Sequence, residues 1–182
     1  YHALKLNTAN SNTAVGANAL ETNTSGDHNT AVGYKALEDN NGSYNTAVGR
    51  EALKDNTSGS GNTAIGWVAL YRNTTGINST ATGIQALQNN TAGEYNTATG
   101  YRALHNNTNG DRNTSAGNMT LYNNTSGSRN TAFGYKAGYG LSTGSNNVYI
   151  GYDAYASTGN VQNEIAIGQG VTGAGTNTVS IG

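Results

Sequence analysis

The chain repeats one short motif at a nearly fixed interval along its whole length. The segment Asn12–Gly16, which reads Asn-Thr-Ala-Val-Gly, returns with small changes up to Thr178–Gly182. Its closing glycines stand at positions 16, 33, 49, 66, 83, 100, 117, 134, 151, 168 and 182, so the interval is 17 residues apart from one step of 16 and a last step of 14. A fixed short period indicates a solenoid, in which each repeat is one structural unit stacked on its neighbours.

Each period contains two segments that a turn separates. An Ala-Leu pair such as Ala36-Leu37 lies three and four residues past the glycine, and an asparagine such as Asn40 comes three residues later. Seventeen residues are too few for a helical repeat, which needs about 33. We therefore predict an all-β fold, a parallel β-solenoid of about eleven 17-residue coils with two short strands per coil, in which a stacking distance of about 4.8 Å gives a rod of about 50 Å.

The alternation of side chains along a strand places Thr13 and Val15 on one face and Ala14 on the other. The valine position is apolar in most copies, which favours burial, and the threonine position shares its face. The predicted coil core consists of Val15, Val32, Val48, Ile65, Phe133, Ile150, Ile167 and Ile181. In this interpretation the alanine column points outward, either because another surface approaches closely or because alanine is simply inherited with the repeat.

The Ala-Leu pair leads to a related expectation. Adjacent strand residues face opposite ways, so Ala36 and Leu37 are not expected to enter the coil together. Either leucine is inside and a second small column lies outside, or a whole leucine column is exposed. Both arrangements favour self-association, because a rod with one apolar stripe closes most simply as a cyclic oligomer.

Composition limits the function further. Hydrophobic residues make up 35% of the chain, which suits a thin core, and charged residues make up 10% with a net charge of −1. The lack of a basic patch argues against a nucleic-acid partner. No apolar run reaches the roughly 18 residues that span a bilayer, so we expect no membrane contact by this segment.

The polar residues predict no catalytic residue, no metal site and no cofactor. His2, His28 and His105 fall at different repeat positions, and cysteine is absent. The acidic residues lie scattered in turns without a calcium-loop pattern, and no glycine run has the form of a phosphate loop. We therefore expect a protein that is not an enzyme.

The residue that follows each glycine is often aromatic. Aromatic side chains on a surface stack on sugars or fill an interface. The predicted stripe, which contacts either a ligand or another chain, comprises Tyr34, Trp67, Tyr101, Tyr135 and Tyr152, with Arg50 and Arg102 nearby.

The repeat resembles the head repeats of YadA-like trimeric autotransporter adhesins. Asn147–Gly151, Glu164–Gly168 and Thr178–Gly182 are most similar to the family motif, Ser/Asn-x-Ala-Ile-Gly, although the turns here are longer. The resemblance implies a left-handed β-roll, a side-by-side homotrimer and adhesion to an extracellular receptor, glycan or matrix ligand. It also implies a place on the cell surface, anchored in the outer membrane through other parts of a longer chain. We expect residues 1–182 to be one head domain excised from such a fibre, with regular long repeats over 1–134 and more standard head-like repeats over 135–182.

Three alternatives stay open. The segment is also consistent with a receptor-binding part of a phage tail fibre. One threonine per coil suggests an ice- or carbohydrate-surface-binding solenoid, although such proteins typically carry two outward threonines per coil. A tail-spike enzyme would need paired carboxylates on a groove, for which Glu38 and Asp55 come closest.

Overall fold

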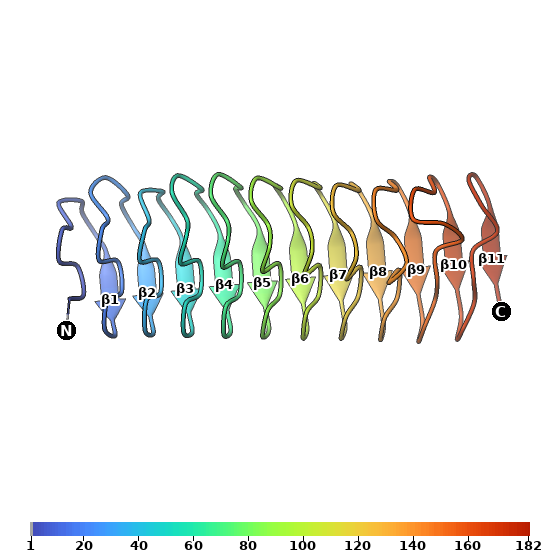
Figure 1. Cartoon of the computed structure of the whole chain (residues 1–182), viewed down its shortest axis with the longest axis horizontal. Helices are drawn as coiled ribbons and strands as arrows, with labels where there is room; N and C mark the ends of the chain where they lie inside the picture. Colours follow the sequence, from blue (N-terminus) through green and yellow to red (C-terminus); the bar gives the residue numbers. More distant parts are fainter. Residues whose placement is uncertain (1) are drawn as a thin grey trace.

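The computed structural model describes residues 2–182, which form one rod of stacked coils with the two termini at opposite ends (Figure 1). The described chain is all-β and contains no helix. One parallel sheet runs the length of the rod in the order β1 to β11. The strands are β1 (Thr13–Val15), β2 (Thr30–Val32), β3 (Thr46–Val48), β4 (Thr63–Ile65), β5 (Thr80–Thr82), β6 (Thr97–Thr99), β7 (Thr114–Ala116), β8 (Thr131–Phe133), β9 (Val148–Ile150), β10 (Ile165–Ile167) and β11 (Val179–Ile181).

The strands stack in register, so equivalent residues of neighbouring repeats lie side by side. Thr13 pairs with Thr30, and Thr30 pairs with Thr46 across the short 16-residue step. The last step of 14 residues keeps the register as well, since Ile165 pairs with Val179. The turns absorb the changes in repeat length, and the predicted parallel β-solenoid is confirmed.

Each coil contains one strand rather than the predicted two. The second segment is a series of turns in which Lys35 and Leu37 have φ angles of 56° and 52°. A left-handed conformation costs a non-glycine residue about 1–2 kcal/mol. Hydrogen bonds between coils offset this cost: the Leu37 amide donates to the Ala52 carbonyl at 3.0 Å, and the Lys35 amide donates to the Ala17 carbonyl at 2.9 Å.

The prediction of which strand face is buried was wrong. The alanine column is inside, and the valine column faces outward, with Val15 58% exposed. Alternation shows that two faces differ but does not say which one is enclosed. The interior of a coil this small leaves room opposite the leucines only for a small strand residue. The fully buried column comprises Ala31, Ala47, Ala64, Ala81, Ala98, Ser115, Ala132, Tyr149 and Ala166.

The expectation for the Ala-Leu pair was also wrong, because both residues of the pair are fully buried. Ala36 and Leu37 point into the same interior, since the positive φ at Leu37 breaks the strand alternation. The leucine column therefore offers no exposed stripe. Its fully buried members are Leu20, Leu37, Leu53, Leu70, Leu87, Leu104 and Leu121.

The other half of the interior is polar, which the sequence interpretation missed. Asn73 belongs to a buried column that follows the leucines, and its amide donates to Asn56 Oδ1 at 2.7 Å and to the Gly76 carbonyl at 2.9 Å. Asn62 belongs to a second buried column, which precedes the strands, and its side chain accepts the backbone amide of Ser79 at 2.9 Å. Buried amides cost little when they are hydrogen-bonded, so each column bonds one coil to the next.

The glycine that ends each strand is fixed by the next coil. Gly66 has a φ angle of 137°, and a Cβ atom there would lie 2.5 Å from the carbonyl oxygen of Gly83. Only glycine allows this approach, which explains why this position is the most regular in the repeat.

Candidate interaction surfaces

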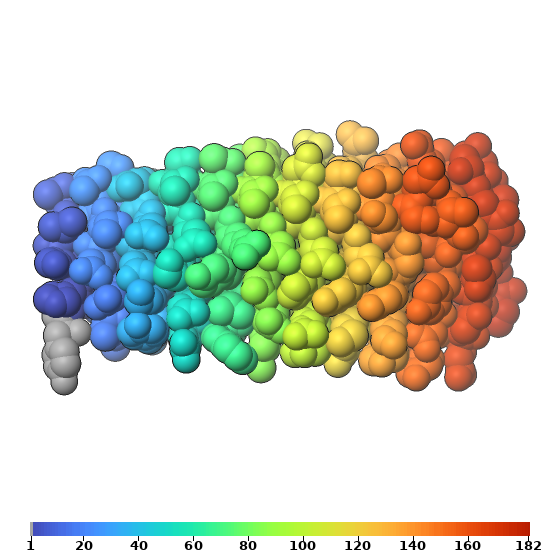
Figure 2. Space-filling view, in the orientation of Figure 1, coloured from blue at the N-terminus to red at the C-terminus, as the bar shows by residue number. Residues whose placement is uncertain are grey.

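The rod presents surfaces rather than a cleft. Its outline is continuous from coil to coil in Figure 2, and the residues from 2 to 182 enclose no pocket. The repetitive strands and turns place equivalent side chains in columns along the axis. Three such columns are candidates for contact with a ligand or partner.

The first surface is the outward face of the sheet, which carries the residues predicted to be the core. Val15, Ile65 and Phe133 are all exposed there, Ile65 by 42%. The threonine column lies beside them on the same face, and its members are exposed or partly exposed. The apolar column is Val15, Val32, Val48, Ile65, Phe133, Ile150, Ile167 and Ile181, with an interruption at Thr82, Thr99 and Ala116.

The interruption gives the middle of the face a different chemistry. In β5 and β6 both outward residues are threonine, so Thr80, Thr82, Thr97 and Thr99 form a patch of hydroxyl and methyl groups. The loss of apolar bulk here leaves no void in the coil, because these side chains point outward.

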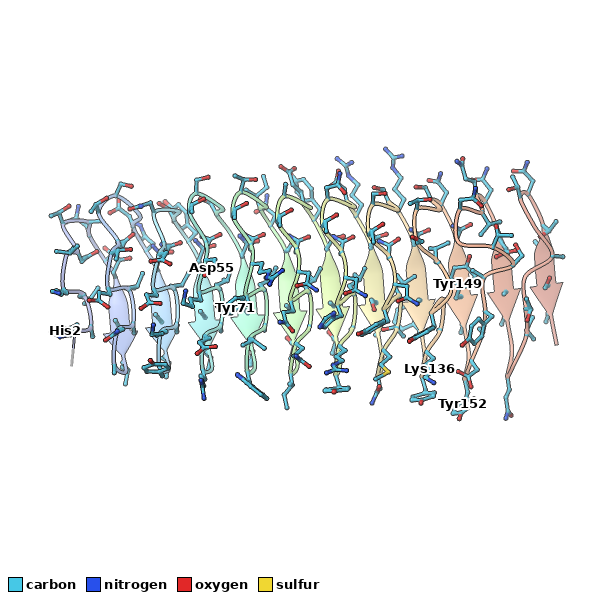
Figure 3. The ribbon with its side chains drawn as sticks, in the orientation of Figure 1. His2, Asp55, Tyr71, Lys136, Tyr149 and Tyr152 are labelled. Atoms are coloured by element: carbon cyan, nitrogen blue, oxygen red, sulfur yellow. The ribbon has the colours of Figure 1, made fainter. Side chains whose placement is uncertain are left out.

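The second surface is the predicted aromatic stripe, which the structure places in one column on the turns that follow the strands. Lys136 and Tyr152 lie on this edge, beyond the ends of the strand arrows (Figure 3). The rings are partly exposed, from 36% at Tyr135 to 54% at Tyr152. We name the column of Tyr34, Arg50, Trp67, Tyr101, Tyr135 and Tyr152, with the cations Lys35, Arg102 and Lys136 beside it, the aromatic strip.

Cations lie on several rings of the aromatic strip. The Arg102 guanidinium is 5.0 Å from the Tyr101 ring centroid, and the Lys136 ammonium is 5.2 Å from that of Tyr135. Tyr135 and Tyr152 stack with centroids 5.0 Å apart. These distances are within the range of cation–π and stacking interactions, which hold the rings in place on the surface.

The third surface is a second aromatic column, which the sequence interpretation missed. His105, Tyr122 and Tyr139 stack in successive coils, with centroid separations of 5.1 and 5.5 Å. Burial lowers the pKa of His105, which favours its neutral form. These residues come five positions after their glycines, so the repeat alignment contains the signal.

One buried polar site interrupts the regular interior near the carboxyl end. Tyr149, labelled in Figure 3, donates its hydroxyl hydrogen bond to Glu164 Oε2 at 3.0 Å. The backbone amides of Ser157 and Gly175 donate to the same carboxylate at 3.1 and 2.9 Å. Burial, reinforced by the Glu164 charge, raises the pKa of Tyr149 above its usual range.

The acidic residues considered for a glycan-cleaving groove do not form one. Lys54 makes ion pairs with Glu38 at 3.4 Å and Asp55 at 2.9 Å, so both carboxylates face a cation. In the part of the chain that the structure describes, no three His, Cys, Asp or Glu side chains gather as metal ligands. Within residues 2–182 there is also no helix with the length and apolar character that crossing a membrane requires.

Comparison with models of protein families, with curated proteins and with solved structures found no match to this chain. The resemblance to adhesin head repeats therefore stays a prediction from the motif. The function has to be argued from the surfaces themselves.

Proposed function

We propose that this chain is a non-catalytic segment of a surface fibre, in which three copies pack side by side through the outward sheet face and present their turns for adhesion. The observation that carries the proposal is the apolar column along this face. Side chains as large as Phe133 and Ile150 are about two-fifths exposed. The column is interrupted at Thr82, Thr99 and Ala116, so its apolar side chains lie in two stretches, and exposed apolar patches of this kind often mark interaction sites.

The length of the sheet face, which runs along the whole rod, supports lateral assembly. Two columns about 7 Å apart, extended over ten steps of about 4.8 Å, span roughly 340 Å² before side-chain relief is counted. Flanking turns would add to this area when copies lie parallel. A rod with a single apolar stripe buries that stripe most simply in a cyclic oligomer, whose symmetry axis runs parallel to the rods. The number three comes from the resemblance to trimeric adhesin heads.

The test is the mass in solution, measured by light scattering after size exclusion. Three copies of an 18.7 kDa chain are expected. Ile65→Lys places a charge on the sheet face and should dissociate the assembly. Ile84→Lys is the matched control, because Ile84 is 45% exposed but lies on the turns. A wild-type mass of one chain, or equal dissociation by both variants, would overturn the proposal.

A second candidate is binding to ice, which the outward threonines favour more than the sequence suggested. Thr80, Thr82, Thr97 and Thr99 form an array with two outward threonines per coil in β5 and β6. An ice-binding face must be free, whereas an assembly interface is covered. If the wild type is monomeric and shows thermal hysteresis that Thr82→Lys abolishes, ice binding would therefore replace the fibre proposal.

A further inference from the structure

We propose that the carboxyl-terminal half of the aromatic strip binds an acidic polysaccharide lying along the rod axis. The binding residues are Tyr101, Arg102, Tyr135, Lys136 and Tyr152. This inference rests on the adhesive role proposed above and assigns it a ligand class and a place. The sheet face would join the copies, and the strip would contact the glycan.

The arrangement of rings suits a linear sugar chain. Tyr101 and Tyr135 lie two coils apart, a separation of about 10 Å along the axis, and Tyr152 follows one coil later. Neighbouring coils are about 4.8 Å apart, close to the advance of one sugar in an extended chain, so two coils correspond to about one disaccharide. The ligand would thus meet Tyr101 and, about one disaccharide later, the stacked pair of Tyr135 and Tyr152.

The charges of the strip differ between its two halves. In the amino-terminal half each cation already has an acidic partner: Lys35 pairs with Glu38 at 3.1 Å, and Arg50 pairs with Glu51 at 3.2 Å. Within residues 2–182, Arg102 and Lys136 pair with no carboxylate. Asp153 occupies the equivalent position one coil after Lys136, so the two cations Arg102 and Lys136 outnumber the one carboxylate beside this half of the strip.

Unpaired cations beside exposed rings indicate a ligand that has both flat apolar faces and negative charge. Arg102 is held in position by a hydrogen bond from Nε to Gln85 Oε1 at 2.7 Å, which leaves its terminal nitrogens free to donate. Such nitrogens bind carboxylates or sulfates in a charge-assisted manner. A uronic-acid polysaccharide combines these groups with sugar faces in every repeat.

The absence of a pocket from the described surface fits an extended ligand rather than a small molecule. A few surface contacts give weak binding, with a dissociation constant on the order of 1 mM for a short oligosaccharide. A polymer that contacts several strips would bind more tightly through multivalency. Side-by-side copies would supply these strips in parallel.

The experiment titrates wild type and variants with a hyaluronan hexasaccharide, and with chitohexaose as the uncharged probe, by calorimetry. Arg102→Gln with Lys136→Gln should weaken hyaluronan binding about tenfold. Lys35→Gln with Arg50→Gln, the matched pair in the neutralised half, should change it less than twofold. Tyr101→Ala with Tyr135→Ala should abolish binding and lower the melting temperature by only about 2–4 °C, because each ring makes only surface cation–π or stacking contacts.

Several outcomes would overturn the inference. These are no hyaluronan binding by wild type, equal loss in both charge pairs, or equal affinity for chitohexaose. Light scattering on each variant separates this inference from the fibre proposal. If Tyr101→Ala with Tyr135→Ala dissociates the assembly, the strip is a contact between chains. A trimer that binds no hyaluronan leaves the fibre proposal intact, and a monomer that binds it leaves the glycan site intact.

Discussion

The coils up to β8 and the coils after it enclose the same interior with different residues. In the first region alanine lies on the strand, leucine on the corner and asparagine in both polar columns. In the second region Tyr149 takes an alanine position, Gly138 a leucine position, and Leu141 and Glu164 two asparagine positions. The exchange shows that each coil requires a filled volume and bonded polar groups, and that more than one set of residues meets both requirements.

The exchanges depend on one another. Tyr149 reaches the space beside the preceding coil, where a Cβ atom on Gly138 would lie 2.8 Å from its Cδ2. The tyrosine brings a hydroxyl into the interior, and Glu164 accepts its hydrogen bond. A smaller exchange occurs within one coil, where the Ser115 and Thr120 hydroxyls bond to each other in place of two alanines. Volume and hydrogen bonding thus change together.

The largest effect is expected when the regular leucine is restored alone. Gly138→Leu should destabilise by about 3–5 kcal/mol or prevent folding, because the new side chain meets the Tyr149 ring. Adding Tyr149→Ala and Glu164→Asn gives all three positions the residues of the regular repeat and should recover most of the lost stability. Urea unfolding at fixed protein concentration measures both. A triple variant that is no more stable than Gly138→Leu alone would contradict the exchange.

Two glycines with positive φ angles should differ in how much stability an alanine costs: Gly66, at a strand end between stacked coils, and Gly170, in the open carboxyl-terminal turn. Gly66→Ala should cost about 3 kcal/mol, because strain at positive φ is added to the contact with Gly83. Gly170 has a φ angle of 66°, and a Cβ atom there would meet no atom of the described chain within 4 Å, so Gly170→Ala should cost only about 1 kcal/mol. Thermal unfolding followed by circular dichroism compares the two, and equal losses would mean that stacking does not set the cost.

The asparagine column that follows the leucines should contribute less to stability at Asn124, next to Leu141, which ends the column. Asn73→Leu removes two donated bonds and the acceptor for Asn90, and should cost about 2–3 kcal/mol. Asn124 donates two bonds, but its Oδ1 is buried without a partner. Asn124→Leu should therefore cost about 1 kcal/mol less than Asn73→Leu. Urea unfolding of both variants measures the difference, and the reverse order would contradict the role of the column.

The smallest effect concerns alkaline pH. A raised folded-state pKa means that the folded protein keeps the Tyr149 proton after the unfolded chain releases it at about pH 10, so stability falls above that pH by about 1.4 kcal/mol per unit. Tyr149→Phe should cost about 1–2 kcal/mol at pH 7, because Glu164 loses a donor, and should remove this part of the alkaline slope. Urea titrations between pH 8 and 11.5 measure it. An unchanged slope in the variant would show that other groups cause the decline.

The aromatic strip and the apolar column were both identifiable from the repeat alignment, since each is a column at a fixed distance from the glycine. The structure placed them differently from each other. The aromatic strip lies on the surface, where it was expected, while the apolar column lies on the outer face and not in the core where it was expected. The buried asparagines and the Tyr149–Glu164 pair were missed, because a polar residue in a sequence gives no sign that its hydrogen bonds are made inside.

From the repeat alone follow the solenoid, the strand that precedes each glycine and the register, because a fixed 17-residue period is typical of stacked coils. The second strand predicted for each coil was wrong. The tertiary structure alone decided which side of each strand is enclosed. Alternation along three residues is symmetric between inside and outside. The symmetry is broken by the left-handed corners, which turn leucine and asparagine inward from the opposite wall. The strand position beside a leucine is therefore filled by alanine or serine, and Tyr149 fits only where Gly138 stands in place of the leucine.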